Sequence, residues 1–305
     1  MSNKLDNQPY KLGIDLGGSK IEAVLLDPAG AMVWRERVKT PAQDYRAILK
    51  AIQQLSQQAE AVAGQSLALG IGTPGAISAR TGLMRNSNTV CINGQNLLHD
   101  LQQLLQRPLR IQNDANCFAL SEAMDGAAAG YSMVFGVIIG TGTGGGVVWD
   151  KKLLSGRHAI GGEWGHNPLP WQQPFDVLRD CYCGKRGCIE TFLSGPGFAA
   201  NAQALGYSNR NSRQIVAAAE QGQVDACQQL EHYYDQLARA LASVINILDP
   251  DAIVLGGGMS NIAGIYTEVP KRLPQYVFYD YVDTPLLAPN YGDSSGVRGA
   301  AWLWP

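Results

Sequence analysis

The chain contains two segments in which a short apolar strand, a glycine-rich turn and a second apolar strand follow one another. In the first, Lys11–Leu16 (KLGIDL) and Ile21–Asp27 (IEAVLLD) flank the turn GGSK. In the second, Met133–Ile139 (MVFGVII) and Gly146–Trp149 (GVVW) flank GTGTGG. Both segments are typical of β-hairpins. Such a repeat favours a duplicated α/β unit. The similarity lies in the pattern of the two segments and not in residue identity, so the alternative that the two segments are unrelated stays open.

Periodicity elsewhere predicts helices and strands in alternation, as in α/β proteins. A chain of 305 residues, 46 % of them apolar, favours two domains. We place the smaller domain at residues 1–117 with about 297–305, and the larger at residues 118–296. The expected strands are Met32–Val38, Leu67–Gly72, Leu109–Gln112 and Ala252–Leu255, and the expected helices are Asp44–Ala63, Leu97–Leu105, Pro196–Leu205, Ser212–Gln221 and Asp225–Leu248.

The charge balance favours a small-molecule partner. Lysine and arginine number 24 against 26 acidic residues, which gives a net charge of −2. The chain therefore lacks the excess of positive charge that would attract nucleic acid or an anionic membrane. The segment MSNKLDNQPY lacks the apolar stretch of a signal peptide, and no apolar run reaches the roughly 18–20 residues that span a bilayer. We therefore expect a cytoplasmic protein, in which thiols stay reduced.

Glycine-rich turns after strands indicate phosphate binding, because their backbone N–H groups can face an anion without intervening side chains. In DLGGSK, Asp15 can hold a hydrated Mg²⁺ while Ser19 and Lys20 reach phosphate, or the segment is an ordinary surface turn. GTGTGGG matches neither a P-loop nor a dinucleotide fingerprint. LGGGMS, at 255–260, can let adenosine lie against bare backbone or can let the next helix pack closely. Together the three loops indicate a phosphoryl-transfer cleft of the actin–hexokinase kind.

Asp114 follows an apolar strand in RIQNDANCF and opens a helix. Either Asn113 or Asp114 can be the N-cap of this helix, a role worth about 1 kcal/mol. Asp114 can also be the general base toward a substrate hydroxyl, since phosphoryl transfer needs the attacking oxygen positioned and relieved of its proton. The two roles are compatible, and the residues alone do not separate them.

Three of the six cysteines lie close together in CYCGKRGC, as Cys181, Cys183 and Cys188, and His166 precedes them in EWGHNPLPW. Three thiolates and one imidazole are the ligands of a closed, structural Zn²⁺ site. Buried free thiols or a disulfide are the alternatives. Glu163 and Glu190 flank the cluster and can accept hydrogen bonds from sugar hydroxyls, or they are solvated loop residues.

The segments GIDLGGSK, GIGTPG, NDANCFALSEA, GTGTGGG, GGEWGH, CYCGKRGCIE and DPDAIVLGGGMSN together resemble the ROK family of bacterial sugar kinases, repressors and related open reading frames. EWGHNPLPW, CIETFLSGPGF and GDSSGVRGAAWLW are most similar to its fructokinase (mannokinase) branch. The resemblance implies an actin-like, hexokinase-type duplicated fold with ribonuclease H-like halves, and a cleft for ATP and sugar between two domains. It also implies a homodimer.

The resemblance assigns roles to individual residues. It implies Asp114 as the catalytic base and a sugar site formed by Asn88, Asn113, Asp114, Glu163, His166 and Glu190. It implies an ATP site formed by Asp15, Gly17, Gly18, Ser19, Lys20, Thr141, Gly142, Thr143, Gly257 and Gly258. Ser19 stands where the family usually has threonine, and NTVCING lacks an aromatic residue often found in that loop, which leaves the sugar preference open.

We therefore expect a kinase that uses ATP with Mg²⁺ to phosphorylate the 6-hydroxyl of a hexose, with D-fructose first and mannose or glucose as further acceptors. The alternative is a kinase of N-acetylglucosamine or N-acetylmannosamine. A sugar-sensing repressor or a non-catalytic sugar-binding protein is disfavoured. Only about ten residues precede the first strand, which leaves no room there for a DNA-binding domain, and Asp15, Asp114 and the four zinc ligands are all present.

Overall fold

The computed structural model describes residues 10–207 and 210–304, and the chain divides into two compact units. The boundaries differ from the expected ones, because α3 (Asp114–Met124) continues through residue 117 and packs against the helix near the C-terminus. We expected no signal peptide in Met1–Tyr10. Residues 1–9 of that segment lie outside the residues that the structure describes. The first unit comprises Met1–Ala129, Gly146–Gly161 and Asn290–Pro305, and the second comprises Gly130–Gly145 and Gly162–Pro289.

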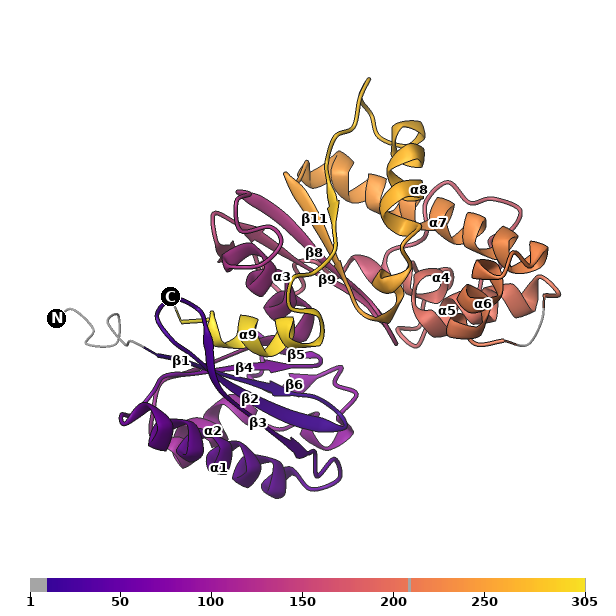
Figure 1. Cartoon of the computed structure of the whole chain (residues 1–305). Coiled ribbons are helices and arrows are strands. Elements are labelled where there is room, and N and C mark those ends of the chain that lie inside the picture. Colours follow the sequence, from indigo (N-terminus) through magenta and orange to yellow (C-terminus); the bar gives the residue numbers. More distant parts are fainter. Residues whose placement is uncertain (1–9, 208–209, 305) are drawn as a thin grey trace. The chain divides into compact units, whose positions relative to one another are not determined.

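The first unit is built on a five-stranded sheet with the order β3-β2-β1-β4-β7 (Figure 1). Strand β1 pairs antiparallel with β2, and β2 with β3, whereas β1–β4 and β4–β7 are parallel pairs. The pairing of β1 with β2 places Asp15 opposite Glu22. The strands are β1 (Lys11–Leu16), β2 (Lys20–Leu26), β3 (Met32–Lys39), β4 (Leu69–Thr73) and β7 (Leu109–Asn113).

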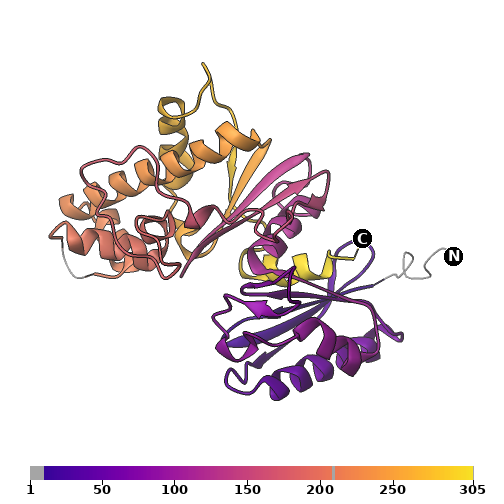
Figure 2. The same ribbon diagram turned by 180° about the vertical axis from the view of Figure 1, so that it is seen from behind.

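Helices cover both faces of this sheet, α1 (Tyr45–Ala63) and α2 (Leu97–Leu105) on one side and α3 and α9 (Ser295–Ala301) on the other (Figures 1 and 2). Alternate side chains of the strands face the two layers, so that Leu25 packs with the α1 side and Val24 with α9. Short elements complete the unit: β5 (Ala76–Ile77), β6 (Met84–Arg85), η1 (Val90–Ile92) and η5 (Gly292–Ser294).

Helix α9 lies unusually close to the sheet. A Cβ atom at Gly13 would overlap the carbonyl oxygen of Val297, and one at Gly70 would overlap that of Ala300. A Cβ at Gly299 would in turn overlap a carbonyl oxygen of α3, at Cys117. Glycine is therefore required at these crossings, and it lets the C-terminal helix complete the layer that carries Asp114.

The second sheet has the order β10-β9-β8-β11-β12. Both sheets thus place their strands third, second, first, fourth and fifth in chain order. The β9–β10 pair is antiparallel and the β8–β11 and β11–β12 pairs are parallel, as in the first sheet. This shared topology confirms the expected duplicated α/β fold. The strands are β8 (Met133–Ile139), β9 (Thr143–Trp149), β10 (Lys152–Leu153), β11 (Ala252–Gly256) and β12 (Leu286–Leu287).

The second unit contains most of the remaining helices, among them the 25-residue α7 (Val224–Leu248), whose buried face includes Tyr233, Leu237 and Arg239. The sequence did not predict α8 (Ile265–Arg272), which contains Pro270. Within the described residues, no helix combines the length and the apolar character needed to cross a membrane. The other elements are α4 (Glu190–Leu193), α5 (Gly195–Ala204), α6 (Ser212–Glu220), η2 (Trp164–His166), η3 (Gly258–Asn261) and η4 (Leu273–Gln275).

Candidate functional site

The turn between β1 and β2 is fixed from outside by Thr40, which is buried beyond the end of β3. The Thr40 hydroxyl donates to the carbonyl oxygen of Gly17 at 2.7 Å, and the Thr40 N–H donates to that of Ser19 at 3.1 Å. Gly17 N–H closes the turn on the carbonyl of Lys20 at 3.0 Å. Gly18 and Ser19 remain exposed at its tip. The turn is therefore rigid at its base and accessible where a phosphate would approach.

Next to this turn, Glu22 on β2 gathers three cationic side chains. Its carboxylate is 1 % exposed and lies 3.5 Å from the Lys20 ammonium. The guanidinium groups of Arg35 and Arg37 approach the same carboxylate to 2.5 and 2.7 Å. Lys20, expected to reach phosphate, is thus oriented by Glu22. Sequence reasoning missed Glu22, although a carboxylate within an apolar strand was a visible signal.

Asp15, near the end of β1, has a pKa raised to about 7. Burial is the main cause, and the negative charges of Asp114 and Glu22 raise the pKa further against Lys20 and Arg37. Asp15 and Asp114 therefore lie within electrostatic reach of each other in the first unit. A carboxyl group in this state can bind a cation strongly once it is deprotonated.

The start of α3 separates two residues that the sequence left interchangeable. Asn113 is the N-cap, with its side-chain oxygen accepting the N–H of Ala115 at 2.9 Å. Its amide nitrogen donates to the carbonyl of Gly75 at 3.1 Å. Asp114 is the first helical residue and accepts the same Ala115 N–H at 2.8 Å. Asn113 is therefore the N-cap, and Asp114 occupies the first helical position, where its carboxylate bonds to Ala115 N–H.

Asn88, expected near the sugar, lies over the first turn. Its side-chain oxygen would be 3.5 Å from a Cβ atom at Gly18. The loop that contains Asn88 is closed by two hydrogen bonds between Ser87 and Asn93, each 2.9 Å long. Asn88 itself is exposed. The structure therefore brings Asn88 together with the residues of the Gly17–Lys20 turn.

The turn between β8 and β9 is fixed by a carboxylate. Glu190, at the start of α4, accepts the N–H of Thr143 at 2.9 Å. A Cβ atom at Gly142 would lie 2.9 Å from the same Glu190 oxygen, so glycine makes room for this contact. Gly257 has a φ of +85°, and a Cβ there would lie 2.5 Å from the carbonyl oxygen of Ile139. The expected ATP residues 141–143 and 257–258 are thus gathered at the end of β8.

His166 and the three clustered cysteines meet at one point. Their ligand atoms all lie within 4.8 Å of one another. The Cys181 sulfur is 3.6 Å from His166 Nδ1, and the Cys183 and Cys188 sulfurs are 3.6 Å apart. Zn–S bonds of 2.3 Å and a Zn–N bond of about 2.0 Å imply S···N and S···S separations of about 3.6 and 3.8 Å in a tetrahedron. The donor set and its spacing fit a Zn²⁺ ion, and each of these cysteines is a free thiol rather than half of a disulfide.

Backbone pairing joins the His166 segment to the cysteine segment. Pro168 and Cys188 form an antiparallel bridge, flanked by bonds from Leu169 N–H to Gly187 O at 3.0 Å and from Ile189 N–H to Asn167 O at 2.9 Å. We call residues 163–171 and 187–190 the paired segments. Because they are bound together, Glu163 and His166 on one and Glu190 on the other are parts of one structure.

The model of the ROK family matches residues 11–305. The chain belongs to the ROK family. An N-acetyl-D-glucosamine kinase from Yersinia enterocolitica is 40 % identical over 297 residues, which cover 95 % of this chain and 98 % of that protein. The ROK hexokinase from Thermus thermophilus superimposes with a TM-score of 0.85 at 29 % identity, covering 96 % of this chain and 97 % of that one.

A second solved ROK structure, a glucokinase from Streptomyces griseus in complex with glucose and AMPPNP, matches with a TM-score of 0.75 at 27 % identity, over 97 % of this chain and 99 % of that one. These likenesses confirm the hexokinase-type fold and the family. They do not support the fructokinase branch, because the curated relatives at 40 % identity are named N-acetyl-D-glucosamine kinases. N-acetylglucosamine, the alternative acceptor, agrees with the comparisons better than fructose does.

Three contacts in this ROK chain were not visible in the sequence. Thr40 holds the first turn, Glu190 holds the second, and the Tyr182 hydroxyl lies 3.0 Å from His166 Nε2. The Tyr182 contact occupies the ring nitrogen of His166 that does not face the cysteines, although His166 was expected in the sugar site. Tyr182 lies between Cys181 and Cys183 in the sequence, and this position was the one feature that could have indicated its contact with His166.

Proposed function

We propose that this chain is a kinase that transfers the γ-phosphoryl group of ATP to the 6-hydroxyl of an N-acetylated hexosamine, with N-acetyl-D-glucosamine as the preferred acceptor. The observation that carries this proposal is the 40 % identity to an N-acetyl-D-glucosamine kinase over 95 % of the chain. It is supported by the residues themselves, because the groups needed for phosphoryl transfer are present and held in defined positions.

The first unit supplies the reacting groups. Asp114, fixed at the start of α3, accepts the proton of the attacking hydroxyl, a contribution of about 10²–10⁴ in rate. Asp15 and the Gly17–Lys20 turn bind the phosphate end of ATP. Mg²⁺, when bound, neutralises charge on the transferring phosphoryl group. The raised pKa of Asp15 means that this carboxyl must lose its proton, near pH 7, before it can hold a cation.

The second unit supplies residues that bind the substrates. Glu163 and Glu190 accept hydrogen bonds from sugar hydroxyls. His166, whose Nδ1 lies beside Cys181 and whose Nε2 contacts the Tyr182 hydroxyl, holds the paired segments in place. Residues 141–143 and 257–258 present backbone to the nucleotide. A Zn²⁺ ion on His166, Cys181, Cys183 and Cys188 would have a structural role, since four protein ligands leave no open position for chemistry. We expect about one zinc per chain by elemental analysis.

We propose that a small cavity in the first unit receives the acetamido group of the sugar. It has a volume of about 100 Å³ and is lined by Asn113, Gly75, Ala76, Ile77 and Ile111 among others. The apolar side chains of Ala76, Ile77 and Ile111 can surround a methyl group. Fructose has no group of this kind. Ala76→Leu should therefore lower activity toward N-acetyl-D-glucosamine more than activity toward glucose.

The deciding experiment is a coupled assay of ADP release with N-acetyl-D-glucosamine, N-acetyl-D-mannosamine, glucose, mannose and fructose. We expect kcat/KM for N-acetyl-D-glucosamine to exceed that for fructose by at least about tenfold, a difference of 1.4 kcal/mol. Strong turnover of fructose with none of the N-acetylated sugars would restore the original expectation. A homodimer and a cytoplasmic location remain predictions, to be tested by light scattering and by fractionation.

A further inference from the structure

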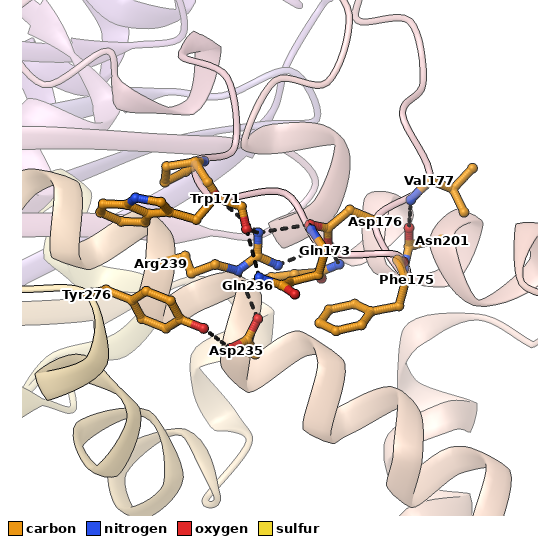
Figure 3. A network of polar contacts seen from close by, with 11 residues as sticks. Trp171, Gln173, Phe175, Asp176, Val177, Asn201, Asp235, Gln236, Arg239 and Tyr276 are labelled. Carbon is orange, nitrogen blue, oxygen red and sulfur yellow. Dashed lines mark hydrogen bonds and ion pairs between the residues drawn. The ribbon is translucent and has the colours of Figure 1, made fainter.

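Arg239 is a fully buried cation on α7 that binds two carboxylates (Figure 3). Its Nη1 and Nη2 atoms donate to the two oxygens of Asp176 at 2.8 and 3.0 Å, and its Nε donates to Asp235 at 2.8 Å. Asp235 also accepts the Tyr276 hydroxyl at 2.6 Å, and Asp176 accepts the Gln236 amide at 2.9 Å. The guanidinium group is thus held in one orientation by partners on three parts of the unit.

The same guanidinium group also holds the end of a paired segment. Its Nη1 atom donates to the carbonyl oxygens of Pro170 and Trp171, at 2.8 and 3.2 Å. Trp171 has a φ of +47°, a left-handed conformation that is unusual for a bulky residue and must be imposed by its surroundings. Its ring stacks on Tyr276 with centroids 5.5 Å apart. Backbone and side chain of Trp171 are therefore both held by the Arg239 network.

A short chain of contacts leads from this network to the candidate site. Pro170 follows Leu169, whose N–H donates to Gly187, and Pro168 pairs with Cys188. Glu190 lies two residues beyond Cys188, and His166 lies two residues before Pro168. Every link in this path is a backbone hydrogen bond or a neighbouring residue. A displacement at Pro170 would therefore be passed on to Glu190, which we propose to bind the sugar, and to His166.

We propose that Arg239 is a positioning residue for the acceptor site, and that it acts by fixing the backbone at Pro170 and Trp171. Since it defines how the sugar is held, this inference rests on the proposed function. Lysine cannot replace arginine here, because a single ammonium cannot reach Asp235, Asp176 and both carbonyls at once. The role requires the guanidinium fork and not only a positive charge.

The test compares Arg239→Lys with Arg272→Met in the full-length protein. Arg272 on α8 binds Glu268 and Glu231 of the same unit but makes none of the contacts that define the paired segments, which makes it a matched control. We expect Arg239→Lys to raise the KM for N-acetyl-D-glucosamine about tenfold or more, with a KM for ATP and a kcat changed less than threefold. Arg272→Met should leave all three near the wild-type values.

Hydrogen–deuterium exchange provides a second readout that needs neither sugar nor metal. Arg239→Lys should speed exchange at the N–H groups of Leu169 and Ile189, whereas Arg272→Met should not. A zinc chelator should also release metal faster from Arg239→Lys. If Arg239→Lys only lowers the melting temperature and leaves exchange and the sugar KM unchanged, the residue is merely structural and the proposal is wrong.

Trp171→Ala decides the question if Arg239→Lys does not fold. Trp171 is about half exposed, so its loss should be tolerated. It should reproduce a smaller increase in sugar KM and in exchange at Leu169, and unchanged values would overturn the proposal. Wild-type protein that fails to phosphorylate N-acetyl-D-glucosamine would instead refute the proposed function, while the exchange comparison would still test the role of Arg239.

Discussion

The two glycine turns occupy equivalent places in the two sheets, yet they are held in opposite ways. The first, between β1 and β2, is fixed by the neutral Thr40 hydroxyl and is surrounded by the charges of Asp15, Lys20 and Glu22. The second, between β8 and β9, contains no charged residue and is fixed by the charged Glu190. One topology has thus acquired two different electrostatic environments.

The two halves of a duplicated fold can in this way take on different tasks. Charges within the first turn suit a metal-bearing phosphate, and Asp114 lies within electrostatic reach of Asp15. The second turn leaves its backbone free of competing charge, and its anchor Glu190 belongs to the paired segments, which we propose to bind the sugar. We therefore expect variants of the first unit to change turnover and its pH dependence, and variants of the second to change substrate affinity.

The sharpest test of this division is Asp114→Asn. Loss of the base should lower kcat by about 10²–10⁴, while sugar affinity and zinc content stay near wild type. Steady-state kinetics and titration calorimetry with the sugar measure the two effects. Near-normal turnover would mean that Asp114 is not the general base, and it would contradict the assignment of the chemical step to the first unit.

Glu190 variants test the second unit. Glu190→Gln keeps an oxygen for the Thr143 N–H but loses the charge, so the sugar KM should rise about 10–30-fold, equivalent to about 1.4–2 kcal/mol. Glu190→Ala removes both and should also raise the KM for ATP, because the second turn loses its anchor. Kinetics of the two variants side by side separate these roles. An ATP effect in Glu190→Gln equal to that in Glu190→Ala would contradict the assignment.

The pH dependence tests the charged first turn. Asp15 has a pKa near 7 in the folded protein and can bind Mg²⁺ only when ionised, so kcat/KM should rise with pH and be about tenfold lower at pH 6 than on the plateau. Glu22→Gln removes a negative neighbour and should move the midpoint to lower pH. Because the folded pKa is raised, the proton on Asp15 stabilises the folded state, and this contribution is lost as pH rises through about 7.

A melting experiment checks that sign. Asp15→Asn should raise the melting temperature above pH 7, because the amide removes the cost of burying a charged carboxylate. Near pH 4 the variant and the wild type should melt alike. A pH-independent difference would mean that Asp15 does not titrate as stated.

The smallest expected effect concerns the neutral anchor of the first turn. Thr40→Val removes one hydrogen bond, to Gly17 O, and should raise the KM for ATP about fivefold, equivalent to about 1 kcal/mol. Thr40→Ser keeps the hydroxyl and is the matched control. If both variants behave alike, the hydroxyl does not anchor the turn, and the contrast between the two turns is weaker than described.

Local features were readable from the sequence. The bounds of β1, β8 and α2 agree with expectation to the residue, because apolar runs there end at glycine or polar residues. The cysteine spacing predicted a quartet with His166 that the structure brings together. Helix α8 was missed because Pro270 in its interior is a signal that normally ends a helix.

Contacts between distant parts of the chain were not readable. Thr143 and Glu190 are 47 residues apart, and Asp176 and Arg239 are 63 apart. No local pattern marks such partners, since their pairing depends on how the sheets and α7 come together. The comparisons favour the alternative acceptor, N-acetyl-D-glucosamine, over fructose, and the motifs that identify the family did not separate these sugars.

Helix α9 has a consequence for the order of events during synthesis. The first unit needs this helix on its sheet, where Gly13 and Gly70 leave no space for anything but its backbone. Its first stretch ends at Ala129, yet its last begins at Asn290, more than a hundred residues later. At typical rates of translation the interval is roughly 8–30 s. Until residues 295–301 have been made, the face of the sheet that receives α9 lacks this helix, so a nascent chain offers chaperones an apolar surface there.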